Sequence, residues 1–310
     1  MAQNDIKHAE VPMRILVTGA SGWIGAASVT GLIAAGHRVS GLARTDEAAA
    51  RIAKLGAEVV RGSLDDVDSL RAAVKRAEGV VHLGYNHDFS QMGAAARTDR
   101  TAIEAFAEVL EGSGGPLLVA SGTLGLVTRG SVGTERDMPD PIVHPRVGNA
   151  AYTLGLAERG IRAMVVRFAP TVHGAGGDHG FVATLARIAR DKGVSAYIGD
   201  GLNRWPAVHR LDAARLVQLA IDKAPAGAVL HAVAEEGIAT RDIAGAIGGF
   251  LDLPVSSIPT GSAAEHFGWL GMFFGVDVPA SSALTRGMLN WDPRRQGLLK
   301  DIGAGHYPGE

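Results

Sequence analysis

A short apolar run followed by three evenly spaced glycines constrains the fold of this chain most. Residues 15–17 are Ile-Leu-Val, which is typical of a strand buried on both faces. Glycines follow at positions 19, 22 and 25, and an alanine-rich helical pattern then runs from Trp23 to about Ala35. Strand, glycine-rich turn and helix in this order predict a βαβ unit that binds a pyrophosphate group.

Each glycine of this turn has a physical task. Gly19 permits the tight turn, Gly22 lets the backbone approach phosphate oxygens, and Gly25 lets the helix pack close to the strand. The helix N-terminus then offers free N–H groups and a positive dipole end to the anion. We therefore expect the cofactor to contact Gly19, Ser21, Gly22, Trp23, Ile24 and Gly25.

Composition excludes several classes of function. The chain has 310 residues, of which 46% are apolar and 20% charged, as in a compact globular protein of one large or two moderate domains. A net charge of −2 gives no basic field for nucleic acid. The chain has no cysteine, and no histidine pattern suggests a metal site. No apolar run approaches membrane-spanning length and the first dozen residues lack a signal-peptide core, so we expect a cytoplasmic protein without a membrane partner.

Strand and helix patterns alternate after the first helix. Strands are predicted at 36–44, 57–61, 79–84 and 115–123, and helices at 46–55, 67–78 and 97–111. This alternation predicts an α/β fold with a doubly wound parallel sheet.

The residue after the second strand bears on the choice of cofactor. An acidic side chain there would bind the ribose 2′-hydroxyl of NAD, but this chain has Arg44, with His37 and Arg38 nearby. A guanidinium suits the 2′-phosphate of NADP, so we predict NADP(H), although Arg44 could be an ordinary surface arginine. Adenine is expected beside the turn at Ser63 and Leu64, where Asp65 is more simply explained as a helix cap.

The end of the fourth strand is expected to lie under the cofactor. Leu83 and Gly84 would contact it there, and Tyr85, His87 and Asp88 then open a loop at the carboxyl edge of the sheet. Tyr85 and His87 are candidate substrate contacts, although polar loop residues are often only solvated.

The glycine turn and the strands after it closely resemble the extended and atypical short-chain dehydrogenases/reductases. The matching segments are Thr18–Gly25, the fifth strand, Val165–Gly174 and the return segment Val208–Asp212, so the resemblance covers Met13 to the C-terminus. It implies a Rossmann-type domain at 13–171 plus about 208–233, a smaller, mainly helical substrate lobe at 172–207 and 234–310, and an extension at 1–12. It also implies nicotinamide contacts at Pro170 and Val172, and the family mildly favours a homodimer.

The catalytic pair of that family is absent. Its chemistry uses a tyrosine and a lysine four residues later, but this chain has tyrosines only at 85, 152, 197 and 307, none followed by that lysine. By the resemblance, Arg146 takes the lysine position, where it would bind the nicotinamide ribose, and Ile142 takes the tyrosine position. Tyr152, further along the same helix, is expected to be structural.

Other positions of the resemblance keep polar groups. Ser121 and Thr123 lie near the usual serine, and Asp99 stands where the family commonly has an active-site asparagine; an atypical NADP-binding subgroup is similar in both respects. Asp99 could instead complement the dipole of a helix whose first turn it occupies. The missing proton could come from Tyr85, His87, His144, His173 or water.

The second lobe indicates the kind of small-molecule substrate. Candidate contacts are His173, Phe181, Trp205 and Trp269, and residues 263–274 gather aromatic side chains that form either a core or an apolar wall over nicotinamide. Arg286, Arg294 and Arg295 could bind an anion. We therefore expect an NADPH-dependent reductase of a small, largely apolar carbonyl compound. The alternatives are a non-catalytic NADP(H) sensor and, ranked last, a sugar-nucleotide epimerase or dehydratase.

Overall fold

One parallel sheet organises the larger part of the molecule. A computed structural model of the chain describes residues 11–88, 91–126, 130–139 and 145–307. The sheet has seven strands in the order β10-β6-β5-β4-β1-β2-β3, all paired in parallel. Its strands are β1 (Arg14–Thr18), β2 (Arg38–Ala43), β3 (Glu58–Arg61), β4 (Gly79–His82), β5 (Pro116–Gly122), β6 (Arg162–Phe168) and β10 (Ala228–Ala232).

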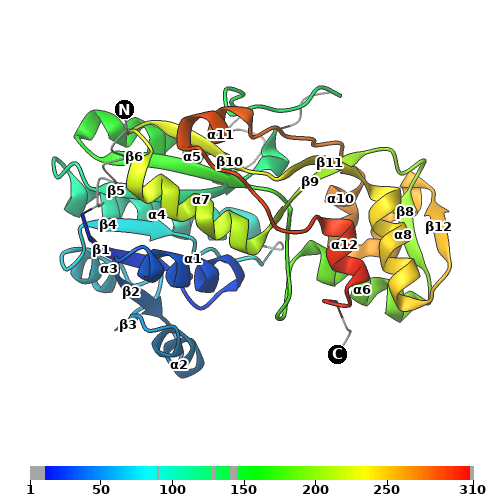
Figure 1. The fold of residues 1–310 in the computed structure, drawn as a ribbon, viewed down its shortest axis with the longest axis horizontal. Helices are drawn as coiled ribbons and strands as arrows, with labels where there is room; N and C mark the ends of the chain where they lie inside the picture. Colours follow the sequence, from blue (N-terminus) through cyan, green and yellow to red (C-terminus); the bar gives the residue numbers. More distant parts are fainter. Residues whose placement is uncertain (1–10, 89–90, 127–129, 140–144, 308–310) are drawn as a thin grey trace, which may run out of the picture.

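Helices cover both faces of this sheet because its strands are apolar on both sides. Ile15 and Val17 of β1 belong to the core shared with α1 and α7, whereas Leu16 between them belongs to the core shared with α3 and α4. Figure 1 shows α1 and α7 side by side on the near face. The helices around the sheet are α1 (Trp23–Ala34), α2 (Asp46–Lys54), α3 (Val67–Val74), α4 (Met92–Leu110), α5 (Pro145–Gly155), α7 (Arg210–Lys223) and α11 (Ala283–Leu289), with short 3-10 turns η2 (Thr123–Gly125) and η3 (Leu156–Arg159).

A second lobe stands beside the sheet and has a core of its own (Figure 1). It contains the sheet β11-β9-β7 and the parallel pair β12-β8. These strands are β7 (Thr171–His173), β8 (Ser195–Ile198), β9 (Arg204–His209), β11 (Glu235–Ala239) and β12 (Val255–Ile258). The helices are α6 (Phe181–Lys192), α8 (Thr240–Leu251), α9 (Ala263–Phe267), α10 (Gly271–Phe274) and α12 (Leu298–Gly303), with η4 (Thr260–Ser262) and η5 (Gly268–Leu270).

The doubly wound parallel sheet predicted from the sequence is confirmed, and two local predictions are wrong. α4 begins at Met92 rather than near Arg97, because after Met92 its first turns are Gly- and Ala-rich and carry no further large apolar residue to reveal a helical period. α3 is capped by Asp66, whose side chain accepts a hydrogen bond from Ser69 N at 3.1 Å. Asp65 instead accepts one from Thr98 Oγ1 at 3.2 Å, which ties the loop after β3 to α4.

Candidate active site

The turn between β1 and α1 is built so that only glycine fits. Gly19 has φ +67°, and a Cβ added to Gly25 would lie 2.0 Å from the Gly19 carbonyl oxygen. Gly22 N donates to the same oxygen at 2.9 Å, which closes the turn. These contacts bring the start of α1 against the end of β1, with Ser21, Trp23 and Ile24 in or beside the turn.

The N-terminus of α1 is left open for an anion. Gly22 is its N-cap, no side chain caps it, and no acidic residue lies in its first turn. The first helical bond runs from Ala26 N to Gly22 O, so the N–H groups of residues 23–25 precede it. By contrast, Thr45 caps α2 and Asp66 caps α3 with their side chains. An uncapped helix end with a close glycine backbone fits a pyrophosphate group.

The loops after β1, β3 and β4 meet at the carboxyl edge of the sheet. Gly84 N donates to Thr18 Oγ1 at 3.1 Å, and a Cβ on Gly19 would lie 2.8 Å from Gly84 N. Leu64 packs beside Gly84, and Ser63 Oγ accepts a hydrogen bond from Asp65 N at 3.2 Å. The sheet order reverses between β1 and β4, which is where ligands bind in open α/β sheets. Leu83, which follows β4 directly, lies at this same place.

Arg44 follows β2 at this edge and is exposed. It makes no hydrogen bond or ion pair with any described residue, whereas the neighbouring Asp46 is paired with Arg61. The expectation that His37 and Arg38 lie nearby is wrong, because they start β2 at the opposite edge. His37 Nε2 lies 2.9 Å from buried Asp222 Oδ1, which explains why this histidine is inside the protein.

Trp23 links the glycine turn to β7, the short strand after β6. Its indole N–H donates to Val172 O at 2.8 Å, and the guanidinium carbon of Arg210 lies 4.3 Å from its ring centroid. Pro170 lies just before β7. The two predicted cofactor-binding segments, the turn at 19–25 and residues 170–172, are therefore in direct contact.

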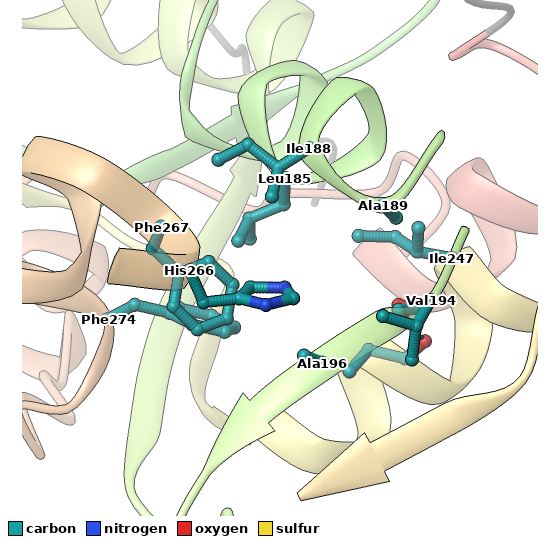
Figure 2. A pocket seen from close by; sticks show the side chains of 11 residues that line it. Leu185, Ile188, Ala189, Val194, Ala196, Ile247, His266, Phe267 and Phe274 are labelled. Atoms are coloured by element: carbon teal, nitrogen blue, oxygen red, sulfur yellow. Dashed lines mark hydrogen bonds between the residues drawn. The ribbon is translucent and has the colours of Figure 1, made fainter. Parts of the chain in front are cut away.

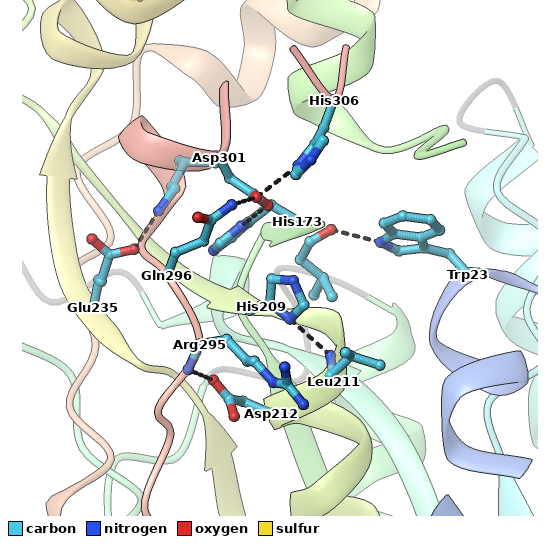
Figure 3. A network of polar contacts seen from close by, with 12 residues as sticks. Trp23, His173, His209, Leu211, Asp212, Glu235, Arg295, Gln296, Asp301 and His306 are labelled. Atoms are coloured by element: carbon cyan, nitrogen blue, oxygen red, sulfur yellow. Dashed lines mark hydrogen bonds and ion pairs between the residues drawn. The ribbon is translucent and has the colours of Figure 1, made fainter. Parts of the chain in front are cut away.

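His173 points away from this contact into a buried polar cluster (Figure 3). Its Nδ1 lies 2.7 Å from Asp301 Oδ2 of α12, and Asp301 also binds His306 Nδ1 at 2.8 Å and the side chain of Gln296. Burial alone would raise the pKa of Asp301, but the hydrogen bonds from His173 and Gln296 and the charge of His173 hold it below its ordinary value. His173 is 1% exposed, so its predicted substrate contact stays a prediction.

Arg146, Tyr85 and the end of β5 form the centre of the candidate site. Arg146 donates from NH2 to Ala120 O at 3.1 Å, and its guanidinium carbon lies 3.9 Å from the ring centroid of Tyr85. Ser121 and Thr123 follow Ala120 and are buried. The hydroxyls of Thr123 and Tyr85 are shielded from solvent and hydrogen-bond to no described residue. Buried hydroxyls without partners are rare and indicate groups kept for a ligand.

Burial and neighbouring groups shift the pKa values of Arg146 and Tyr85 in opposite directions. Burial lowers the pKa of the Arg146 guanidinium, and Asp99 and Tyr85 raise it, but an arginine stays protonated at neutral pH. Burial raises the pKa of the Tyr85 phenol, while Arg146 lowers it and Asp99 raises it. Tyr85 is therefore a neutral phenol beside a fixed cation. His87, in the same loop, is exposed, and its ring centroid lies 5.3 Å from that of Tyr85.

Asp99 lies inside a buried chain of polar groups. Thr18 Oγ1 and His82 Nδ1 are 2.7 Å apart, His82 Nε2 and Asp99 Oδ1 are 3.1 Å apart, and Asn149 Nδ2 donates to Asp99 Oδ2 at 2.6 Å. Burial alone would raise the pKa of Asp99, but the hydrogen bond and charge of His82 and the charge of Arg146 lower it. Asp99 lies two turns into α4, so the idea that it complements a helix dipole is wrong.

Sequence reasoning missed His82 and Asn149. A histidine inside the apolar run 79–83 was a usable signal, because a buried imidazole needs a polar partner. Asn149 had no such signal, since nothing local shows which face of α5 is buried.

Tyr152 of α5 faces α4, as expected for a structural residue. The guanidinium carbon of Arg100 lies 3.4 Å from its ring centroid, and Arg159 NH1 lies 3.5 Å from its hydroxyl. Ile142 and His144, the predicted tyrosine position and a candidate donor, lie outside the described residues, as do residues 1–10 of the predicted extension.

Comparisons with known proteins agree with this geometry. The model of the NAD dependent epimerase/dehydratase family matches residues 15–233. The chain belongs to this family. It is 47% identical to an uncharacterized protein of Schizosaccharomyces pombe, over 95% of this chain and 100% of that protein, and 42% identical to an uncharacterized protein of Saccharomyces cerevisiae, over 95% and 99%. Among solved structures, UDP-glucose 4-epimerase of Thermus thermophilus in complex with NAD has a TM-score of 0.74 at 21% identity, covering 95% of this chain and 99% of that chain, and thus shares the fold.

Proteins of this family use an NAD(P) cofactor, and the glycine turn has the geometry to hold one. Three features together form a cradle for a dinucleotide. They are the glycine turn, in which a Cβ would clash with the backbone, the uncapped N-terminus of α1, and the hydrogen bond between Trp23 and Val172. Within residues 11–88, 91–126, 130–139 and 145–307, no group of three or more His, Cys, Asp or Glu side chains is arranged to hold a metal ion. No helix in the described part of the chain is long and apolar enough to span a bilayer.

The aromatic residues of the second lobe divide into a core and an accessible wall. Phe267 and Phe274 are buried, as the core interpretation predicts, whereas Trp269 is 39% exposed. Phe181 joins the two groups, with its ring centroid 5.6 Å from Trp269 and 5.5 Å from Trp205. Trp205 is 0% exposed and donates to Val276 O, which makes it part of the core, and its predicted substrate contact stays untested.

Two cavities lie away from the glycine turn. An apolar pocket in the second lobe, lined by α6, α8 and His266, holds about 210 Å³ of empty space but is too narrow for a water molecule (Figure 2). A groove of about 510 Å³ is lined by residues at the amino ends of β1, β4, β5 and β6, at the edge opposite the turn.

Proposed function

We propose that this chain is an NADP(H)-dependent oxidoreductase that reduces the carbonyl group of a small, largely apolar substrate. The assignment of NADP(H) as the cofactor rests on two features: the uncapped N-terminus of α1 at the glycine turn, and the exposed Arg44, without an ionic partner among the described residues, at the end of β2. An exposed guanidinium without an ionic partner can bind a 2′-phosphate without breaking an existing contact.

The reaction part rests on the buried groups at the end of β5. NADPH, when bound, supplies a hydride to a carbonyl carbon. The chain's own contribution is to hold the carbonyl oxygen near unpaired hydroxyls, of which Thr123 Oγ1 is one, and near the fixed charge of Arg146. Such donors stabilise the negative charge that develops on oxygen as the hydride arrives.

The second lobe supports an apolar substrate over a nucleotide sugar. Its accessible wall at Phe181 and Trp269 is aromatic. Two of the three candidate arginines have local partners: Arg294 pairs with Asp292 at 2.7 Å, and Arg286 donates to Ala234 O. Arg295 is exposed, and its backbone N–H donates to Asp212 Oδ2 at 2.9 Å. A diphosphate would need cations that are free to bind it.

Cofactor binding and turnover separate this proposal from its alternatives. Titration of the purified protein with NADPH and NADH tests the cofactor, and oxidation of NADPH with benzaldehyde and acetophenone derivatives tests the reaction. We expect the protein to bind NADPH. We also expect aromatic carbonyl compounds to oxidise the bound NADPH faster than sugar nucleotides do. Binding without oxidation by any of them would identify a sensor, and no binding would refute the cofactor assignment.

A further inference from the structure

Reduction of a carbonyl group requires a proton as well as a hydride. The identity of the proton donor is inferred here on the basis of the proposed function. Hydride arrival at the carbonyl carbon makes an alkoxide, which needs a proton from a nearby donor. Arg146 cannot provide it, because a guanidinium does not release its proton in proteins. The donor must therefore be another acid, a phenol, an imidazolium or water, at the carboxyl edge of the sheet.

Most candidate donors are already committed elsewhere. His173 is bound to Asp301 in the buried cluster of α12. Tyr152 is stacked on Arg100 between α4 and α5. Tyr197 lies in β8, and Tyr307 follows α12, so both belong to the second lobe.

Tyr85 differs from these groups in its position and in its neighbours. It lies in the loop after β4, at the ligand-binding edge. Its hydroxyl is shielded from solvent and, like that of Tyr307, has no hydrogen-bond partner among the described residues. Its ring lies 3.9 Å from the guanidinium carbon of Arg146, which is itself bound to Ala120 O just before Ser121 and Thr123. A phenol, a cation and a second unpaired hydroxyl thus gather at the ends of β4 and β5.

We propose that Tyr85 is the catalytic proton donor, and that Arg146 is the residue that positions it and stabilises its phenolate. The two residues come from different elements, the loop after β4 and helix α5, rather than from one helix. Asp99, held by His82 and Asn149, balances the buried charge of Arg146.

The step balances without a further reactant. The carbonyl carbon accepts a hydride, with its electron pair, from the reduced nicotinamide, which becomes oxidised. The carbonyl oxygen takes the proton of the Tyr85 O–H group, so one O–H bond breaks as another forms. The phenolate, next to the Arg146 cation, then takes a proton from water.

The matched pair Tyr85→Phe and Tyr152→Phe tests the donor. Both tyrosines are stacked on an arginine, but only Tyr85 lies at the site. The probes are NADPH and benzaldehyde in single-turnover reactions, in which the fluorescence of NADPH reports its binding and its oxidation. Tyr85→Phe is expected to keep NADPH affinity within about threefold and to slow hydride transfer by about 10²- to 10⁴-fold, whereas Tyr152→Phe stays within about twofold of the unchanged protein.

The role of Arg146 has a separate readout. Ultraviolet difference titration of the protein against Tyr85→Phe isolates the ionisation of the Tyr85 phenol. Arg146→Met is expected to raise the pKa of the Tyr85 phenol by roughly one pH unit, because the cation is lost. Arg146→Lys keeps a cation and is expected to reverse most of this increase. Because any cation at this distance shifts the ionisation of the phenol, the hydride-transfer rates of the same variants decide the role: they should follow the same order, and rates that do not change would show a cation that only stabilises the fold.

Each negative result has a distinct meaning. A Tyr85→Phe protein that retains more than about a tenth of the hydride-transfer rate, with a primary isotope effect from deuterated NADPH, overturns Tyr85 as donor and leaves the reductase proposal intact. An unchanged protein that binds NADPH but reduces no carbonyl overturns both. Failure to bind NADPH overturns the cofactor assignment first.

Discussion

Replacing Arg44 with alanine should change the choice between NADP(H) and NAD(H). Arg44 is exposed at the carboxyl end of β2 and has no ionic partner among the described residues. Its loss therefore removes no internal contact, and the stability of the fold should not change. Any effect on nucleotide binding then reports on the side chain itself.

The size of the effect follows from the contacts that a guanidinium can make. A hydrogen bond to a charged group contributes about 1.5–3 kcal/mol, and two are possible to one phosphate. Ordering a free arginine costs about 2 kcal/mol, and solvent at this exposed position weakens the attraction further. A net loss of about 1–3 kcal/mol remains, or roughly 5- to 150-fold in the dissociation constant of NADPH.

Titration of both proteins with NADPH, NADH and 2′,5′-ADP measures this difference. NADPH and 2′,5′-ADP should bind more weakly to Arg44→Ala, and NADH should bind as before. Arg38→Ala is the matched control, because Arg38 is an exposed arginine at the other end of the same strand. Equal weakening of NADPH and NADH, or an unchanged ratio between them, would show that Arg44 does not read the 2′-phosphate.

Three further changes test other parts of the structure. Gly25→Ala should abolish NADPH binding, because its Cβ would lie 2.0 Å from a backbone oxygen, whereas Gly31→Ala in the same helix, with its nearest atom at 3.9 Å, should bind normally; equal titrations would contradict this. His37→Ala should lower the free energy of unfolding by about 1–3 kcal/mol in urea, since the buried carboxylate of Asp222 loses His37 and keeps only Gln218 as a side-chain partner among the described residues, and an unmoved midpoint would argue against a buried pair. The pKa of Asp301 is lowered in the folded state, so its contribution to stability is present above about pH 4 and is lost as pH falls below it. Melting temperatures of the unchanged protein should therefore fall more steeply from pH 5 to 3 than those of Asp301→Asn, and parallel curves would refute the linkage.

The parts of the fold that the sequence predicted are those set by local pattern. The strand at 15–17, the glycines and helix α1 are adjacent in the chain, so steric rules for one turn are enough to place them. The alternation of strands and helices likewise predicted the parallel sheet. α4 was placed late because the alanines of its first turns have no periodicity to read.

The polar clusters could not be predicted, because their members are far apart in the chain. His173 and Asp301 are separated by 128 residues, and Asn149 and Asp99 by 50. Only the packing of α12 on β7, and of α5 on α4, brings them together. The sequence also does not distinguish a buried tryptophan from an accessible one. It therefore predicts substrate contacts for both Trp205 and Trp269, although only Trp269 is exposed.

The electrostatics of the site favour a retained reaction over a decayed one. The guanidinium of Arg146 is partly buried, and removing a cation from water is costly unless an opposite charge is close. The structure provides that charge in Asp99, and Asp99 is in turn held by His82 and Asn149. A protein that only binds its cofactor gains nothing from burying this cation against an unpaired phenol, since the same volume filled by apolar side chains would be at least as stable. The arrangement makes physical sense if negative charge develops beside Arg146 during turnover, first on the carbonyl oxygen and then on the Tyr85 phenol.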